Sequence, residues 1–591
     1  MSKHKHPESI YELLAASAVA HPDKTAITYI ESVSPAINDT RISYPAFVGM
    51  MNQAARLVHR ELEGRRGVVS FLLPNIPQAQ VILWGGSAVA VVNPLNPLLD
   101  EDTLLSLLDA AGTDILFALG PQEQPGIWEK AMALAPRSKT LKKIYSVDAP
   151  DGKSVHPHYD TEVAQESDSP LPQYWLPKAD DDATYFHTGG TTGVPKLAVQ
   201  SHKNHVVTAR SRSKYSGLEA GEAIINGLPL FHIGGSTLNS LGMFAGGVNV
   251  ILPTVEGYRN KAVINNIWRL VEHYRIASNI CVPTSMAAIL QVPVGDADIN
   301  SLRLSVSGGA VVPDVVSDGV QTITGHPLYQ IYAMTETTGL TALPAPHVPV
   351  VKGCAGWIPP EVEIRIGDGA QGPGEAGEIF IRSEAVFEGY LKHDENPIDP
   401  QGWLASGDLG YVDEQGRLFV TGRSKDLIIR SGHNIDPLAI EACLEQHPAV
   451  ALAAAVGRPD SYAGELPIAF VQLVDGQSAS PEQLVAFALD NISERPACPR
   501  QIFILEALPV TAVGKIHKPS LREKATELAV RESLTDTFPA MHFEVTAEIG
   551  KGGQMLVSVA SAEPSAEVQA LLRKLAAELK LVLPEDCNEP A

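Results

Sequence analysis

Hydrophobic and polar residues follow two periods in the first half of the chain. In FVGMMNQAARLV, apolar side chains recur every three or four positions from Phe47 through Met51 and Ala54 to Val58, the spacing of an amphipathic helix. The short apolar runs GVVSFLL and AVVNPL are typical of buried strands, and the helical run QVILWGGSAVA lies between them. Strands that alternate with helices predict parallel sheets covered by helices on both faces.

The alternation continues to about residue 332 and then changes. The expected strands of this second series are AIINGL, VNVIL, ASNICV, RLSVSG and LYQIY. Beyond residue 360 the runs EVEIRI, GEIFIR and YVDEQGRLFVTG alternate polar and apolar residues, with DEQG as a hairpin turn. We therefore predict an α/β fold with a large N-terminal domain of stacked α/β sheets, residues 1–421, that ends in a β-rich subdomain.

The remainder of the chain predicts a second, smaller unit and a tail. Residues 426–525 have the pattern of a small α+β domain, which a hinge at 422–425 would make mobile. Residues 526–591 form a C-terminal extension in which HFEVTAEI and QMLVSVA predict a hairpin and VQALLRKLAAELKLVL predicts one amphipathic helix. We expect the extension to serve packing or contact with another copy of the chain in a homodimer.

Composition narrows the classes of function. A chain of 591 residues is too long for one core, and its 45 basic and 68 acidic residues give a net charge of -23. This charge disfavours nucleic acid and anionic membrane surfaces as partners. No apolar run reaches about 18 residues, so no transmembrane segment is expected. The N-terminus is too polar for a secretory signal.

The cysteines indicate the redox environment. No two of the five form a CxxC pair, so neither a disulfide framework nor a thiolate metal site is indicated, and a cytoplasmic protein is expected. They are Cys281, Cys354, Cys443, Cys498 and Cys587.

The run TGGTTGVPKLA, residues 188–198, predicts a phosphate site. Glycines let backbone N–H groups converge on an anion, threonine hydroxyls add donors, and Lys196 adds a positive charge. A Walker loop needs glycine before its lysine and a hydroxyl after it, whereas Pro195 and Leu197 occupy these places. The run is therefore not a P-loop.

Five further runs follow in a fixed order: NGLPLFHIGG (226–235), QIYAMTETTG (330–339), SGDLGYVDEQG (406–416), GRSKDLIIRSGHNIDPLAIE (422–441) and PVTAVGKIHKPSLR (509–522). Together with the glycine-rich run, the chain resembles the adenylate-forming enzymes: acyl-CoA synthetases, firefly luciferases and adenylation domains of peptide synthetases. It departs from the family pattern at four positions. Gly189 stands where serine is usual, and Leu197 and Ala333 stand where glycine is usual. Lys518 lies near the position of a frequent arginine. No departure removes a charged group.

The resemblance implies a reaction in two steps. A carboxylate attacks the α-phosphorus of ATP, giving an acyl-adenylate and pyrophosphate, and the thiol of coenzyme A then displaces AMP. Lys515 is implied as the cation at the α-phosphate, Glu336 as a ligand of Mg²⁺, and His232 as the group beside the carboxylate. The implied nucleotide-binding residues are Thr188, Gly190, Thr191, Thr192, Lys196, Gly308, Gly309, Ala310, Gln330, Tyr332, Thr335, Asp408 and Arg423.

Rotation of the small domain would let one site serve both steps. By resemblance, Lys425 is the pivot, and Ser431, Gly432 and His433 line the coenzyme A tunnel after rotation. The small, apolar segments 234–244, 282–290 and 306–312 favour a medium-chain fatty acid or an aromatic or cyclic acid.

Four functions remain open from the sequence. The leading one is a carboxylate–CoA ligase. The alternatives are a ligase that passes the acyl group to a carrier protein or stops at the adenylate, a monooxygenase of the luciferase kind, and an inactive adenylate-binding regulator.

Overall fold

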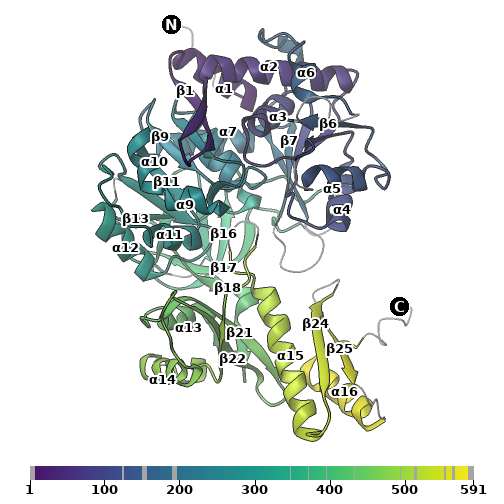
Figure 1. Cartoon of the computed structure of the whole chain (residues 1–591), viewed down its shortest axis with the longest axis vertical. Helices are drawn as coiled ribbons and strands as arrows, with labels where there is room; N and C mark the ends of the chain where they lie inside the picture. Colours follow the sequence, from purple (N-terminus) through teal and green to yellow (C-terminus); the bar gives the residue numbers. More distant parts are fainter. Residues whose placement is uncertain are drawn as a thin grey trace.

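Two mostly parallel sheets form the large domain of the computed structural model (Figure 1). The structure describes residues 7–122, 126–148, 156–188, 196–346, 348–369, 372–393, 396–431, 433–492, 494–511, 515–550, 554–561 and 566–583. The first sheet has the strand order β6-β5-β3-β4-β7-β8. Its strands are β3 (Val68–Leu72), β4 (Val91–Pro94), β5 (Ile115–Leu119), β6 (Lys143–Val147), β7 (Asp182–His187) and β8 (Leu197–Ser201).

The second sheet has seven strands in the order β13-β12-β11-β9-β10-β1-β2, and only its β1–β2 pair is antiparallel. Its strands are β1 (Thr25–Ser32), β2 (Asn38–Ser43), β9 (Ala223–Asn226), β10 (Asn249–Pro253), β11 (Ile276–Cys281), β12 (Leu304–Gly308) and β13 (Leu328–Ile331). The parallel sheets expected from the alternating pattern are confirmed.

Helices α3 and α7 are largely buried within this domain. Helix α3 (Pro77–Ser87) is buried at almost every position, as expected of a helix packed on several sides. Helix α7 (His202–Lys214) begins at an N-cap, Ser201, whose side chain accepts from the backbone of Asn204. Further helices of this domain are α1 (Ile10–Ala20), α2 (Tyr44–Glu61), α4 (Glu101–Ala111), α5 (Ile127–Leu134), α6 (Tyr159–Val163), α8 (Gly242–Phe244), α9 (Lys261–Asn265), α10 (Ile267–Tyr274), α11 (Pro283–Leu290) and α12 (Asp314–Thr324).

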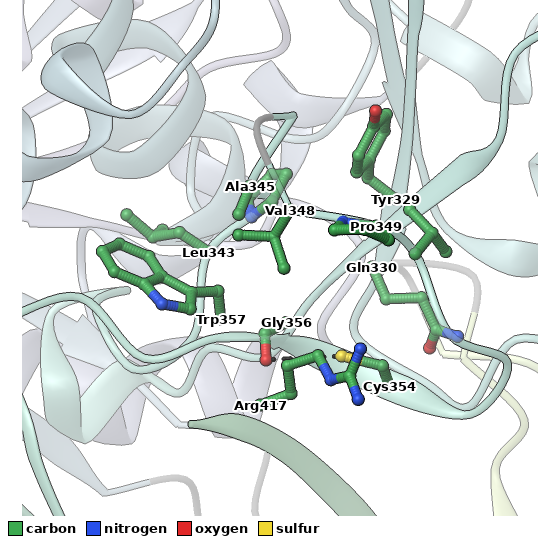
Figure 2. A pocket seen from close by; sticks show the side chains of 12 residues that line it. Tyr329, Gln330, Leu343, Ala345, Val348, Pro349, Cys354, Gly356, Trp357 and Arg417 are labelled. Atoms are coloured by element: carbon green, nitrogen blue, oxygen red, sulfur yellow. Dashed lines mark hydrogen bonds between the residues drawn. The ribbon is translucent and has the colours of Figure 1, made fainter. Parts of the chain in front are cut away.

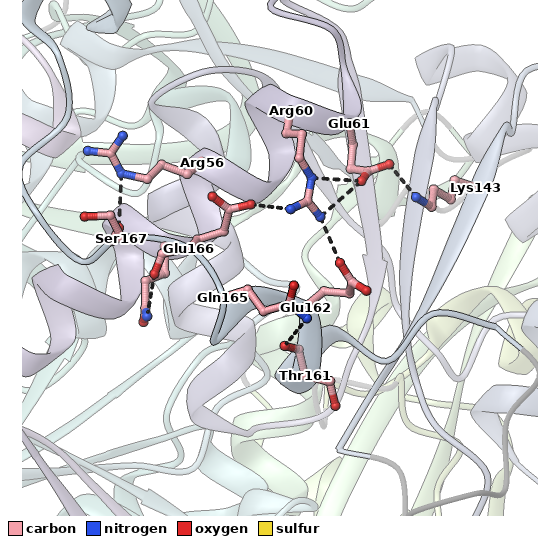
Figure 3. Close-up of polar contacts among 10 residues, drawn as sticks. Arg56, Arg60, Glu61, Lys143, Thr161, Glu162, Gln165, Glu166 and Ser167 are labelled. Atoms are coloured by element: carbon pink, nitrogen blue, oxygen red, sulfur yellow. Dashed lines mark hydrogen bonds and ion pairs between the residues drawn. The ribbon is translucent and has the colours of Figure 1, made fainter.

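An ion-pair network joins α2 to α6 (Figure 3). Arg60 contacts Glu162 at 2.9 Å and Glu166 at 2.5 Å, and Lys143 contacts Glu61 at 2.5 Å. The Arg60 side chain is 45% exposed, so these pairs add little to stability. We regard them as surface contacts with no part in the candidate site.

A five-stranded antiparallel sheet completes the large domain, in the order β14-β18-β17-β16-β15. Its strands are β14 (Cys354–Trp357), β15 (Glu363–Ile366), β16 (Gly377–Arg382), β17 (Leu404–Val412) and β18 (Arg417–Arg423). The predicted β-rich subdomain is thus confirmed, and its last strand ends two residues before Lys425.

The small domain lies beyond this strand (Figure 1). Its sheet has the order β20-β19-β22-β21, with β23 beside β22. The elements are β19 (Ile428–Arg430), β20 (His433–Ile435), β21 (Val450–Asp460), β22 (Gly464–Leu473), β23 (Ile502–Leu505), α13 (Pro437–Leu444), α14 (Pro481–Asn491) and α15 (Lys518–Thr537). The predicted boundary at residues 525 and 526 falls within α15.

The extension is built on α15. It contains a hairpin, β24 (Phe543–Ile549) and β25 (Met555–Ser561), and helix α16 (Ala566–Leu579) (Figure 1). The outer edge of β24 is covered because Glu523 and Glu527 accept hydrogen bonds from the backbone of Ile549 and Ala547, at 3.1 and 3.2 Å. Covered edges resist pairing with other chains. Within the described residues, no helix has the length and apolar character needed to cross a membrane.

Candidate active site

Lys515 of the small domain lies against Gly309 of the large domain. A Cβ atom placed on Gly309 would lie 3.0 Å from Cε and 3.6 Å from Nζ of Lys515. Gly309 directly follows β12 and has a φ of +85°, a conformation that side chains other than glycine rarely adopt. Two residues predicted for the site from distant parts of the sequence therefore meet across the two domains.

The segment that carries Lys515 is held on both sides. The Lys515 carbonyl accepts from the backbone N–H of Thr511 at 2.7 Å, and the Lys515 N–H donates to the Thr511 hydroxyl at 3.2 Å. On the other side, Lys518 pairs at 2.8 Å with Glu441, which is 8% exposed. Lys518, one of the departures from the family pattern, thus anchors the segment to α13.

Burial and charge set the protonation of Lys515. Burial, and next the nearby positive charge of Arg423, lower the pKa of Lys515 to about 8, while Asp408 and Glu336 oppose that change. Lys515 is still mostly protonated at pH 7. Arg423, Asp408 and Glu336, three predicted site residues, are therefore close enough to interact electrostatically with the ammonium group of Lys515.

His232 is neutral in this environment. Burial, followed by the charges of Lys515 and His187, lowers the pKa of His232 to about 3. The backbone N–H of Gly234 donates to its Nδ1 at 3.1 Å, so Nδ1 is unprotonated and Nε2 carries the ring proton. The ring can therefore donate one hydrogen bond without adding charge.

His187 is a site residue that the sequence analysis missed. It ends β7, directly before Thr188, and its ring stacks on Phe231 with centroids 6.2 Å apart. Its Nε2 is buried and has no hydrogen-bond partner in the described ranges, and burial lowers its pKa to about 4. Its position directly before the glycine-rich run could have marked it as a site residue, but a single histidine before a loop does not by itself indicate a function.

Asp408 is held by two predicted partners. The hydroxyl of Tyr332 donates to Oδ2 of Asp408, and Nε of Arg423 donates to Oδ1 at 2.9 Å. Asp408 is 4% exposed, and strand pairing sets it opposite Arg423. Burial and the Asp408 charge raise the pKa of Tyr332 well above its usual value. The carboxylate is therefore fixed in orientation, and its remaining lone pairs can accept further hydrogen bonds.

Glu336 lies in a second polar group. It belongs to the short helix Thr335–Thr337, and its Oε1 accepts from the hydroxyl of Tyr390 at 2.6 Å. The ammonium of Lys196 lies 5.1 Å from the centroid of the Tyr390 ring. Tyr390 thus joins two predicted phosphate or metal residues, and the sequence analysis missed it. Tyr390 belongs to none of the predicted motifs, and the aromatic residues near it in the sequence look like those of an ordinary buried segment.

The ends of the glycine-rich loop lie close together. The backbone N–H of Thr188 donates to the carbonyl of Lys196 at 2.8 Å. Gly190, Thr191, Thr192 and, in the small domain, Gly432 lie outside the described residues. On the other side of Lys196, Gln200 of β8 donates to the Thr335 carbonyl at 2.7 Å, so β8 links the loop to the segment of Glu336.

Gly308, Ala310 and Gln330 lie where β12 and β13 end. A Cβ on Gly308 would lie 2.4 Å from the Ile331 carbonyl oxygen, so glycine permits the close approach of the two strands. Ala310 is exposed. Gln330 lines a small pocket of about 30 Å³ with Cys354 and Arg417 (Figure 2). This volume has room for about two or three water molecules.

The predicted hinge and tunnel residues lie in the small domain. Lys425 is exposed in the short helix Ser424–Asp426, and Arg522 of α15 donates to the Lys425 carbonyl at 2.9 Å and to Asp426 at 3.0 Å. Ser431 and His433 are exposed around the β19–β20 turn.

The residues present fit a magnesium ion held mainly by nucleotide oxygens. Among the described residues, no three His, Cys, Asp or Glu side chains are grouped so that they could hold a metal. Mg²⁺ commonly needs only one or two protein carboxylates beside substrate phosphates, and Glu336 offers one.

Two family models match the chain. The AMP-binding enzyme family matches residues 14–391, and the AMP-binding enzyme C-terminal domain matches residues 439–515. Among similar sequences, the marinolic acid–CoA ligase of a Pseudoalteromonas species is 34% identical over 91% of this chain and 84% of its own length. The long-chain-fatty-acid–CoA ligase of Bacillus subtilis is 28% identical over 88% of this chain and 95% of its own.

Solved structures have the same fold. The anthranilate CoA ligase AuaEII in complex with anthranoyl-AMP has a TM-score of 0.77 and 22% identity, covering 88% of this chain and 98% of its own. ATP-bound MatB from Rhodopseudomonas palustris has a TM-score of 0.76 and 24% identity, covering 88% of this chain and 99% of its own.

Proposed function

Because the chain belongs to the family of AMP-binding enzymes, we propose that it is an ATP-dependent carboxylate–CoA ligase that releases pyrophosphate and AMP. The observation that carries this proposal is the contact of Lys515 with Gly309, within electrostatic range of Asp408 and Glu336. A cation, a ribose acceptor and a metal ligand are the groups that adenylate formation needs.

In the first step, Lys515 offsets the repulsion between two anions. The carboxylate oxygen bonds to the α-phosphorus as the bond to the pyrophosphate oxygen breaks, and negative charge gathers between them. A lysine about 4 Å away contributes up to ~4 kcal/mol at an effective dielectric near 20. Its pKa of about 8 in the free protein keeps the needed charge at neutral pH.

His232 is proposed to orient the reacting carboxylate. Its neutral ring, with the proton on Nε2, can donate to one carboxylate oxygen and leave the other free to attack. A charged histidine would bind the carboxylate more strongly in the ground state and lower its nucleophilicity. The low pKa therefore suits a positioning role.

The nucleotide is proposed to bind along the edge formed by β12, β13 and β17. Asp408 accepts from the ribose hydroxyls, Tyr332 packs on adenine beside Gly309 and Ala310, and Arg423 contacts ribose or phosphate. Thr188, Lys196 and the loop between them hold the β- and γ-phosphates with Thr335. When bound, Mg²⁺ would neutralise phosphate charge, and Glu336 would hold it.

For the second step, we propose that the small domain rotates at Lys425. Rotation would carry Lys515 away and bring Ser431, Gly432 and His433 to the channel for the thiol. Hinge motions of this kind concentrate the dihedral change in a few residues.

The acid is proposed to be of medium length, or aromatic or cyclic, because small and apolar residues dominate segments 234–244, 282–290 and 306–312. Transfer to a carrier protein is the second candidate for the acceptor. A homodimer and a cytoplasmic location stay predictions.

One assay separates these functions. Purified protein is given ATP, Mg²⁺ and a panel of acids, with and without coenzyme A, and pyrophosphate, AMP and thioester are measured. A ligase makes thioester and AMP in equal amounts only with coenzyme A. Adenylate without thioester favours the carrier-protein alternative, and no pyrophosphate with any acid contradicts the proposal.

A further inference from the structure

Arg212 of α7 is buried and has no counter-ion among the described residues. The residue is 1% exposed, and neither its Nε nor its Nη1 has a hydrogen-bond partner in the described part of the chain. An arginine side chain stays protonated in proteins, so its burial is costly unless an anion or acceptor lies against it. Burial alone lowers the pKa of Arg212 to about 10, and no carboxylate offsets that change.

Arg212 faces the segment that follows His232. His205 lies two turns earlier on the same face of α7 and meets the hydroxyl of Thr237 at 3.0 Å through its Nδ1. At the other end, a Cβ on Gly242 would lie 2.7 Å from Cγ of Arg212. This face of α7 therefore packs along the π-helix Gly234–Leu241 and its end at Gly242.

Two further buried polar groups, one on α7 and one on the π-helix, have no hydrogen-bond partner among the described residues. Thr208, one turn earlier on α7, is fully buried, and its hydroxyl has no hydrogen-bond partner in the part of the chain described. A helical arginine directs its side chain toward the preceding turn, and hence toward Thr208. Oδ1 of Asn239, on the π-helix two residues after Thr237, is also buried and unpaired among the described residues. Several buried groups of this kind in one region indicate a missing partner.

The position of this region relates it to the acyl group. The π-helix begins two residues after His232, where the proposed function has the reacting carboxylate. Eight residues would span roughly 12 Å at the α-helical rise of about 1.5 Å per residue, and the i→i+5 hydrogen bonds of a π-helix make this segment somewhat shorter. An acyl chain that leads away from the carboxylate along this helix would end near Arg212.

We propose that the acid substrate carries a second carboxylate at its remote end and that Arg212 binds this group. The Nε or the Nη1 of Arg212, each paired with the neighbouring Nη2, can offer two parallel N–H donors to the two oxygens of a carboxylate, and the Thr208 hydroxyl can add a third hydrogen bond. The inference rests on the proposed function and refines its substrate: a dicarboxylic acid rather than a wholly apolar one.

The test compares acids in pairs of equal length. The wild-type enzyme is assayed for pyrophosphate release with straight-chain monocarboxylic acids of six to twelve carbons and with the matching α,ω-dicarboxylic acids. At one length we expect kcat/KM for the diacid to exceed that for the monoacid by at least about a hundredfold, since a site built to bind a polar group rejects analogues that lack it. Activity with monoacids but no preference for any diacid overturns the inference.

Two variants assign the preference to Arg212. Arg212→Met keeps the side-chain length and removes the charge, and it should lose about a hundredfold in kcat/KM for the diacid while changing the monoacid by less than threefold. Arg210→Met, an exposed arginine of the same helix, is the matched control and should change neither. A diacid preference that survives in Arg212→Met overturns the assignment.

The remaining outcomes are also decisive. If Arg212→Met does not fold, Thr208→Val is measured instead, and a diacid preference that it leaves unchanged counts against the site. A buried water rather than a substrate would give wild-type enzyme no preference at any length. If no acid of either kind releases pyrophosphate, the proposed function itself fails.

Discussion

The pKa of Lys515, about 8, ties the first half-reaction to a proton equilibrium. Loss of the proton removes the positive charge that offsets the phosphate and carboxylate anions. We therefore expect kcat/KM for ATP, measured by acid-dependent exchange of pyrophosphate into ATP, to fall as pH rises through about 8. His232 does not contribute to this fall, because its pKa of about 3 keeps it neutral throughout.

Lys515→Arg supplies the control for this pH profile. Arginine keeps its proton above pH 12, so the variant should lose rate at all pH values through altered geometry but show no fall near pH 8. An identical fall in both proteins would assign the titration to another group.

Asp408 offers a second test at the scale of single residues. Asp408→Asn keeps the shape of the side chain but removes the charge that ribose hydroxyls would contact. Hydrogen bonds to charged groups contribute about 1.5–3 kcal/mol, so we expect the KM for ATP to rise by about 10- to 100-fold with the fold unchanged. The measurement is initial rate against ATP concentration, with circular dichroism to check folding.

Asp413→Asn is the matched control for Asp408. Asp413 lies on the turn between β17 and β18 of the same sheet, and its carboxylate pairs with Nε of Arg417 at 2.7 Å. The variant removes this similar ion pair. Its KM for ATP should stay within twofold of the wild-type value. An equal rise in both variants would indicate a general loss of sheet stability rather than a lost ribose contact.

At the scale of elements, α15 connects the proposed hinge to Lys515, the proposed catalytic lysine. Helix α15 begins three residues after Lys515, and Arg522 on its second turn binds the peptide group between Lys425 and Asp426. On the other side of the hinge, Arg423 is bound to Asp408. These two arginines fix both sides of the hinge and confine its freedom to Ser424 and Lys425.

Arg522→Met should therefore loosen the hinge. With the peptide after Lys425 no longer bound to α15, Lys515 is held less well over Gly309. We expect about tenfold slower pyrophosphate exchange, the size of one lost charge-assisted hydrogen bond, and faster amide hydrogen exchange at residues 424–428. Arg531→Met removes a similar contact of the same helix, 3.4 Å to the Val545 carbonyl, and should leave both measurements unchanged.

The elements differ in how far the sequence predicted them. Strands such as β9 and β12 were predictable because a short apolar run between polar turns has few other conformations. The bounds of α15 were less predictable, because its polar surface continues across the expected end of the small domain. The π-helix Gly234–Leu241 was expected only as pocket lining, since no local pattern distinguishes a π-helix from an α-helix.

The residues of the candidate site likewise divide into those that the sequence predicted and those that it did not. Gly309 and Lys515 were both implied by the family resemblance, Lys515 within the run 509–522, and the structure brings them into contact. Tyr390, His187 and Arg212 were missed because the residues that each packs against lie far away in the chain, and one residue in an apolar or aromatic run has no period to reveal it. Their partners depend on packing between elements, which local patterns do not contain.

At the scale of the whole molecule, we assign the contact between the two domains to the first of the two proposed half-reactions. Lys515 lies at Gly309, while Ser431 and His433 are exposed around the β19–β20 turn. A molecule that stayed in this arrangement would keep its catalytic lysine in the path of the second step. The two half-reactions should therefore respond differently to the loss of Lys515.

Lys515→Ala tests this directly. Losing up to ~4 kcal/mol of transition-state stabilisation slows acid-dependent pyrophosphate exchange by roughly a thousandfold. Given acyl-adenylate prepared beforehand and coenzyme A, the same variant should form thioester at close to the wild-type rate, because rotation has already removed residue 515 from the site. A lysine with a purely structural role would slow both reactions together, and equal losses in the two assays would contradict rotation of the small domain while leaving the family of the chain unchanged.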